Sequence, residues 1–310
     1  MKVLVTGATG YIGGRLIPRL LEEGHQVRVL ARDPERVAGR AWSSQVEIVA
    51  GDVLRGDTLP AALSGVDVAY YLVHSMGSAG DFEDRDRQAA SNFVAAGQRL
   101  KQVIYLGGLL PQDASQPLAS RGEVGAILRA GLPTTEFRAG PIVGSGSASF
   151  EMVRYITERI PLLLAPRGVN HAIQPIGVGD MLSYLVRALD GRAQGVVDVG
   201  ADRLSFGDML RVYASIRGLH RTLVEFPLIT PAFAANWVGW LTPIPHSLAA
   251  PLLAGLGHPV VADTSRAETL FGEIYPLSYH QAVERALERV DVPTSWRSAL
   301  RSDYRVERVE

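Results

Sequence analysis

The fold is decided near the start of the chain by KVLVTGATGYIG, residues 2–13. Residues 2–5 read as a short apolar strand, and glycines follow at positions 7, 10 and 13. After them, the apolar residues within 16–21 recur at the spacing of an amphipathic helix. A strand that runs through a glycine turn into a helix is typical of a site where a phosphate group meets the start of a helix.

Each glycine has a predicted role. Gly7 permits a tight turn, Gly10 lets backbone amides approach a pyrophosphate, and Gly13 lets the helix pack closely on the strand. The alternative is a glycine-rich turn that holds no ligand. We predict a dinucleotide site, and its expected residues at this turn are Thr6, Gly7, Thr9, Gly10, Tyr11, Ile12 and Gly13.

Four further apolar stretches follow the first strand: residues 24–30, the residues before Gly51, residues 68–73 and residues 103–106. Helical patterns separate them, and this alternation predicts an α/β fold with a doubly wound parallel sheet and right-handed crossovers. We place a dinucleotide-binding domain at residues 1–145. A mixed region at residues 146–310 should complete the sheet and form a small, mostly helical C-terminal lid.

The end of the second strand predicts which cofactor is bound. NAD-dependent proteins place an acidic side chain there, whereas this chain has Ala31 followed by Arg32. An arginine fork suits a 2′-phosphate, so NADP(H) is expected over NAD(H). Asp33 complicates this prediction because it can pair with Arg32 or repel the phosphate. Arg32 can also be an ordinary surface charge.

Composition limits the function classes. The 310 residues are 47% hydrophobic and carry a formal net charge of −1, which gives no electrostatic case for binding nucleic acid. The chain has no cysteine, which excludes disulfides, zinc thiolate sites and cysteine nucleophiles. A cytoplasmic location is the simplest expectation, because no signal peptide precedes the glycine turn. The oligomeric state stays open.

The glycine spacing resembles that of the extended and atypical short-chain dehydrogenase/reductase superfamily. Longer stretches resemble its NmrA-like NAD(P)H-binding branch, namely YLVHSMG at 71–77, SRGEVG at 120–125, TEFRAG at 135–140 and GSGSASFEM at 144–152. The resemblance implies an NAD(P)-binding Rossmann fold. It also implies that Asp52 and Val53 lie at the adenine, although Asp52 can equally be a turn aspartate.

The chain departs from the superfamily at the catalytic positions. A serine after the fifth strand and a Tyr-x-x-x-Lys pair are usual, whereas this sequence has Gly107 and Gly108, then Pro117 and Arg121. Arg121 can bond the cofactor ribose but cannot pass on a proton, because guanidinium stays charged in proteins. The chain is therefore expected to be a reductase without the Ser-Tyr-Lys set. The alternatives are a non-catalytic redox sensor or assembly protein, and an isomerase or lyase with transient hydride transfer.

Candidate catalytic residues are expected at the carboxyl ends of the strands. His74 ends the fourth strand and is either a proton donor or a structural histidine. Glu136 and Arg138 share one face of the sixth strand, so they form a buried ion pair or a substrate clamp. Polar groups after this strand are expected to face the substrate; they are Ser145, Ser149 and Glu151. Ser149 reads equally well as a helix N-cap, and Asp180 reads as a cap.

No charged residue occurs between Glu225 and Asp263, a segment that includes Trp237 and Trp240. Six prolines interrupt it, so no stretch approaches the ~20 residues of a membrane-spanning helix. We predict a lid whose tryptophans line a site for a small hydrophobic substrate. The alternatives are a lid whose apolar face is simply core, and a surface that touches a membrane or a partner.

Overall fold

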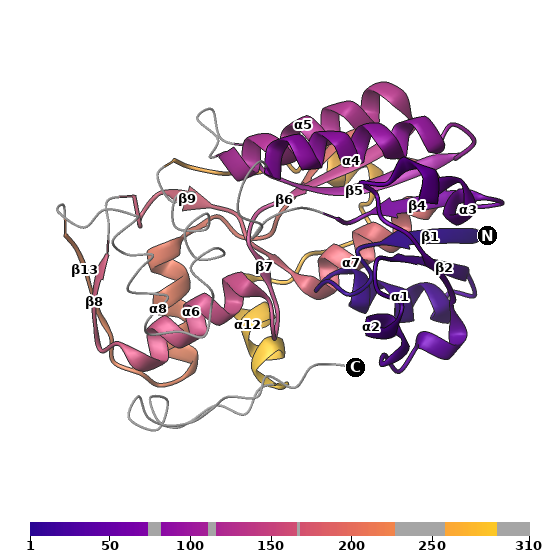
Figure 1. The fold of residues 1–310 in the computed structure, drawn as a ribbon. Helices are drawn as coiled ribbons and strands as arrows, with labels where there is room; N and C mark the ends of the chain where they lie inside the picture. Colours follow the sequence, from indigo (N-terminus) through magenta and orange to yellow (C-terminus); the bar gives the residue numbers. More distant parts are fainter. Residues whose placement is uncertain (74–81, 111–115, 166–167, 227–257, 290–310) are drawn as a thin grey trace.

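The computed structural model describes residues 1–73, 82–110, 116–165, 168–226 and 258–289. Its centre is a seven-stranded parallel sheet in the order β11-β6-β5-β4-β1-β2-β3 (Figure 1). The strands are β1 (Lys2–Thr6), β2 (Gln26–Ala31), β3 (Glu47–Ala50), β4 (Val68–Tyr71), β5 (Gln102–Gly108), β6 (Thr134–Ala139) and β11 (Gly195–Val199). The predicted α/β Rossmann fold is confirmed, and the order reverses between β1 and β4.

Helices cover both faces of this sheet, which explains why its strands are continuous apolar runs rather than alternating ones. One face packs on α1 (Gly13–Glu22), α2 (Glu35–Ala38), α7 (Val178–Arg187) and α11 (Ser265–Leu270). The other face packs on α3 (Leu59–Leu63), α4 (Phe82–Ala96) and α5 (Gln116–Gly131). Figure 1 shows α4 and α5 side by side over this second face. Three short 3₁₀ turns lie at Ser43–Gln45, Gly56–Thr58 and Ala188–Asp190.

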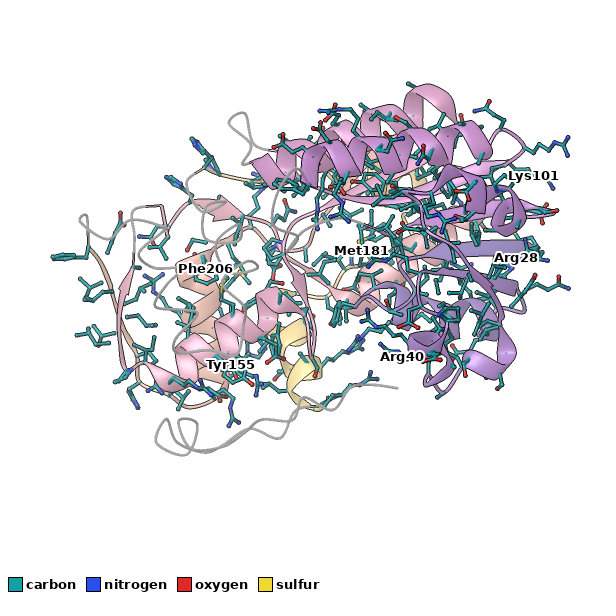
Figure 2. All side chains as sticks on the ribbon, in the orientation of Figure 1. Arg28, Arg40, Lys101, Tyr155, Met181 and Phe206 are labelled. Carbon is teal, nitrogen blue, oxygen red and sulfur yellow. The ribbon has the colours of Figure 1, made fainter. Side chains whose placement is uncertain are left out.

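A smaller unit lies beyond the carboxyl end of β6, on the left of Figure 1. It has its own apolar core between α6 (Ala148–Arg159), α8 (Phe206–Ile216) and α12 (Tyr279–Leu287). Three two-stranded pairs accompany them: β7 (Ile142–Val143) with β10 (Ile176–Gly177), β9 (Ala172–Ile173) with β12 (Leu204–Ser205), and β8 (Leu162–Ala165) with β13 (Thr222–Glu225). In Figure 2, Met181 marks the larger unit and Phe206 the smaller one.

The chain passes between the two units more than once. After α6 it returns through α7 to supply β11, which pairs with β6 as the outermost strand. It then enters α8, whose start is fixed by a capping box between Ser205 and Asp208. Ser278 and Gln281 form a second capping box at the start of α12. No helix within the described ranges is long and apolar enough to cross a bilayer.

Candidate functional site

A cavity of about 790 Å³ lies at the carboxyl edge of the sheet, beside the point where the strand order reverses. Crevices at this position hold the ligand in open α/β sheets. The walls come from the glycine turn and the ends of β2, β3 and β4, with one side closed by α4. Its lining includes Thr6, Gly7, Thr9, Gly10, Arg32, Asp52 and Val53. We name this space the cofactor pocket.

The glycine turn is built to keep side chains out. Gly7 has φ +73°, and a Cβ there would lie 2.6 Å from the carbonyl oxygen of Leu72. A Cβ at Gly13 would lie 2.4 Å from the carbonyl oxygen of Gly7, so this glycine packs on the turn itself rather than on the strand. Gly10 is exposed, and a Cβ there would meet only the carbonyl oxygen of Gly7, at 3.1 Å. Among the described residues, no side chain therefore lies against the backbone at Gly10.

The start of α1 offers free hydrogen-bond donors. Ile12 is its N-cap, no side chain caps it, and no acidic residue occupies its first turn. Within the described part of the chain, the backbone amides of Ala8, Thr9, Tyr11 and Ile12 make no hydrogen bond. Unsatisfied amides at the positive end of a helix favour an anion. The backbone therefore fits the pyrophosphate that the sequence predicts here.

Two residues of the turn use their side chains elsewhere. The Thr6 hydroxyl donates to the carbonyl of Tyr70 at 3.0 Å and accepts from the amide of Leu72 at 3.1 Å, which ties β1 to the end of β4. The Tyr11 side chain lines a second cavity, not the cofactor pocket, and burial raises its pKa to about 12. Of the groups of Tyr11, the backbone amide alone is left for the predicted role in binding the cofactor.

The β2 end of the cofactor pocket is cationic. Arg32 and Arg36 are both exposed and line it, and neither bonds to any residue that the structure describes. Asp33 accepts from the amide of Glu35 at 3.1 Å, so its carboxylate serves the start of α2 and forms no ion pair with Arg32. Sequence reasoning missed Arg36, since only the short helix α2 brings it beside Arg32.

Asp52 and Val53 lie at the end of β3, on the wall of the pocket. One carboxylate oxygen of Asp52 accepts from the amide of Leu54 at 3.0 Å, as expected of a turn aspartate. The turn role leaves Asp52 on the pocket wall, and its contact with the adenine stays a prediction. Arg85 and Asp86 of α4 also line this pocket, and sequence reasoning missed both.

The end of β5 leaves little space for a side chain as its neighbours are placed. A Cβ at Gly107 would lie 3.3 Å from Glu136 Oε1, and one at Gly108 would lie 2.9 Å from Leu118 Cδ2. The same Cβ at Gly108 would lie 3.8 Å from Arg121 Nη1. The Arg121 guanidinium bonds to no described residue, and burial lowers its pKa. Pro117 lies in the first turn of α5, and His74 falls outside the described residues.

Glu136 is held at the centre of a charged cluster. Its side chain is 1% exposed, and it accepts from Arg138 Nε at 2.7 Å and from Arg129 Nη1 at 2.9 Å. A Cβ at Gly125 would lie 2.4 Å from Glu136 Oε2, so the carboxylate fits only because α5 has a glycine there. With both oxygens engaged, Glu136 is suited to holding Arg138 in place rather than to moving protons. Arg129 was not foreseen.

The predicted substrate residues after β6 are engaged mostly within their own loop. Ser147, not Ser149, caps α6 by accepting from the amide of Phe150, and Ser149 donates to the carbonyl of Ile142 at 2.7 Å. Glu151 accepts from the amide of Gly146 at 2.9 Å and pairs with Arg154 at 2.6 Å. The Ser145 hydroxyl is buried and makes no hydrogen bond to a residue that the structure describes. Trp237 and Trp240 lie outside the described residues.

Asp180 does not cap a helix, contrary to the prediction. Gly177 is the N-cap of α7, and no side chain caps that helix. The Asp180 carboxylate instead accepts from the amide of Leu277 at 3.0 Å, which ties α7 to the segment before α12. Burial raises its pKa. The prediction failed because the amide partner lies 97 residues away in the sequence.

Comparison with known proteins agrees with this geometry. Residues 7–130 match a family model described as NAD(P)H-binding. A 3 beta-hydroxysteroid dehydrogenase/Delta 5→4-isomerase of Mycobacterium tuberculosis is 33% identical over 116 residues, which are 34% of this chain and 30% of that protein. A ceramide reductase of Caulobacter vibrioides is 26% identical over 235 residues, 73% of each protein. The chain thus spans less than a third of the steroid dehydrogenase.

Solved structures share the fold over nearly the whole chain. Triphenylmethane reductase of Citrobacter sp., complexed with NADP(H), has a TM-score of 0.71 at 18% identity and covers 92% of this chain and 100% of its own. A nucleoside-diphosphate-sugar epimerase of Staphylococcus aureus has a TM-score of 0.73 at 15% identity, with the same coverage of both chains. These findings show that residues 7–130 match an NAD(P)H-binding family and that the chain shares the fold of these dehydrogenase-like and epimerase-like proteins.

Proposed function

We propose that the protein is an NADP(H)-dependent reductase that acts on a hydrophobic small molecule without a Ser-Tyr-Lys set. The observation that carries the cofactor choice is that Arg32 and Arg36, at the β2 end of the cofactor pocket, bond to no described residue. Two guanidinium groups without a carboxylate partner in the described part of the chain suit a phosphate, and Ala31 stands where an acid would favour a ribose hydroxyl. The glycine turn and the free amides of α1 would hold the pyrophosphate.

When bound, the cofactor supplies a hydride. Arg121 is the side chain nearest the end of β5 that has spare donors, so it would hold the ribose or a substrate oxygen. Its guanidinium donates hydrogen bonds but gives up no proton, and the proton would come from His74 or from water. Glu136 would hold Arg138 so that its remaining nitrogens face this edge of the sheet.

A hydrophobic substrate is supported by the apolar segment around Trp237 and Trp240 and by one relative. The ceramide reductase of Caulobacter vibrioides, which matches over 73% of its length, is named for a lipid substrate. Most of the charge-free segment lies outside the described residues. We place the protein in the cytoplasm and in the NmrA-like branch, with membrane contact limited to the surface.

The second candidate is a non-catalytic NADP(H) sensor or assembly protein. It is favoured by Gly107, Gly108 and Arg121 at the positions where the superfamily has its serine and lysine. A sensor would bind the oxidised and reduced cofactors with different affinities and would show no substrate-dependent oxidation of NADPH. A reductase would oxidise NADPH when supplied with apolar enones, aldehydes or quinones.

Calorimetric titration with NADPH and NADH tests the cofactor assignment. Arg32→Ala and Arg36→Ala are each expected to weaken NADPH binding by about ten- to a hundredfold, the value of one charge-assisted hydrogen bond. NADH affinity should stay within about twofold, because it has no 2′-phosphate. Arg55→Ala, which removes an exposed arginine outside the pocket, is the matched control. Equal losses for both cofactors, or equal affinities in the unmodified protein, would contradict the NADP(H) preference.

A further inference from the structure

A second cavity, of about 570 Å³, lies beside α1 and shares no described lining residue with the cofactor pocket. One wall is α1, another is the start of α7 with residues 143–145, and the third is α12 with the residues just after it. Figure 1 shows α1 and α7 side by side at the lower face of the sheet, with α12 in the neighbouring unit. We name this space the arginine cavity.

Four arginines line the arginine cavity: Arg15 and Arg19 from α1, and Arg285 and Arg289 from the α12 side. None of the four lies within 4.0 Å of a carboxylate that the structure describes. Three carboxylates share the lining, namely Glu22, Asp180 and Glu288, and Asp180 already accepts from the amide of Leu277. The lining therefore carries a net positive charge among the described residues, although burial raises the pKa of Asp180 and the charges of Arg285 and Arg19 act on that carboxylate to lower it.

Arg15 is fixed in position before any ligand arrives. It donates to the carbonyl of Ser145 at 2.9 Å and to that of Tyr11 at 3.3 Å, and its guanidinium lies 4.0 Å from the centre of the Tyr11 ring. Burial lowers its pKa, and the charges of Arg289 and Arg40 lower it further. Two further cations thus act on one partly desolvated guanidinium, and a bound anion would relieve this repulsion.

The size and charge of this cavity indicate the class of ligand. A volume near 570 Å³ falls in the range of small-molecule sites. Guanidinium groups on two walls of one cavity can each donate to a different oxygen of a phosphate, which has more acceptor oxygens than a carboxylate. We infer that the arginine cavity binds a phosphate-bearing small molecule at a site separate from the cofactor. Because Arg15 touches the Tyr11 carbonyl, an occupant of this cavity borders the back of the glycine turn.

Inorganic pyrophosphate is the probe, titrated by calorimetry into protein saturated with NADPH so that the cofactor pocket is closed to it. Binding is expected, and the double variant Arg285→Gln/Arg289→Gln should weaken it by about tenfold or more. Both arginines are exposed, so the variant should fold normally and keep its affinity for NADPH. The matched control is Arg55→Gln/Arg99→Gln, which removes two exposed positive charges outside both cavities.

Three outcomes would overturn the inference: no binding of pyrophosphate to the NADPH-saturated protein, equal binding by the double variant, or an equal loss in the control. Potassium chloride at the same ionic strength should not produce the binding signal that pyrophosphate gives. Vesicles of phosphatidylcholine with phosphatidic acid distinguish the source of the phosphate. Binding of pyrophosphate without vesicle binding assigns a soluble ligand, whereas vesicle binding lost in the double variant assigns a lipid headgroup.

Discussion

Glu136→Gln is expected to lower the free energy of unfolding by about 3 kcal/mol, the lower end of what breaking a buried charge pair costs. The neutral amide removes the carboxylate that pairs with both Arg129 and Arg138, whose side chains are only 26% and 21% exposed. The effect stays at the lower end because both guanidinium groups reach solvent. Urea denaturation followed by circular dichroism measures it.

Glu123→Gln is the matched control for Glu136→Gln. Glu123 lies on the same helix, α5, and pairs with Arg87, but both side chains are more than 40% exposed. Exposed pairs contribute about 0–1 kcal/mol. A loss below about 1 kcal/mol for Glu136→Gln would show that the cluster behaves like a surface ion pair, and the positioning role of Glu136 would fail with it.

Gly125→Ala tests the same cluster from the side of α5. In an exposed helix this substitution would stabilise by about 1 kcal/mol. Here it is expected to destabilise by about 1–3 kcal/mol, because the new Cβ would lie 2.4 Å from Glu136 Oε2. In the Glu136→Ala background the same change should cost nothing. Additive effects of the two substitutions in a double-mutant cycle would contradict the proposed contact.

The sequence predicts the backbone of the site better than its side chains. The strand, glycine turn and helix at residues 2–22 are encoded locally, by apolar spacing and by positions that tolerate no Cβ, and the structure has them at the expected place. Local signals fail where the partner comes from elsewhere. Tyr11 belongs to the glycine motif, yet its ring packs with Arg15 beside a different cavity.

Caps and charge pairs show the same limit. Ser147 and Ser149 are equally good N-caps by residue type, and only the backbone of the loop selects Ser147. Glu136 and Arg138 are neighbours on one strand and could be paired from sequence alone, whereas Arg129 comes from α5 and depends on how that helix packs. Arg36 joins Arg32 for a comparable reason. The candidate site was therefore predictable at its glycines and only partly at its charges.

Gly13→Ala is expected to weaken NADPH binding by about a hundredfold and to lower the free energy of unfolding by about 1–3 kcal/mol. A Cβ at this position would lie 2.4 Å from the Gly7 carbonyl oxygen and 2.9 Å from the Ala8 Cα, both of them backbone atoms that cannot rotate away. The turn must move, and the amides of Tyr11 and Ile12 move with it. Calorimetry with NADPH and thermal unfolding measure the two effects.

Gly14→Ala separates this steric effect from a general effect of alanine in α1. Its Cβ would lie 3.4 Å from the Ala8 carbonyl oxygen, an ordinary contact, and the residue is the next one along the same helix. It should keep NADPH affinity and gain up to about 1 kcal/mol of stability, because alanine favours the helix. If Gly13→Ala bound NADPH as tightly as Gly14→Ala, the turn would tolerate a Cβ, and the geometry assigned to the pyrophosphate cradle would be wrong.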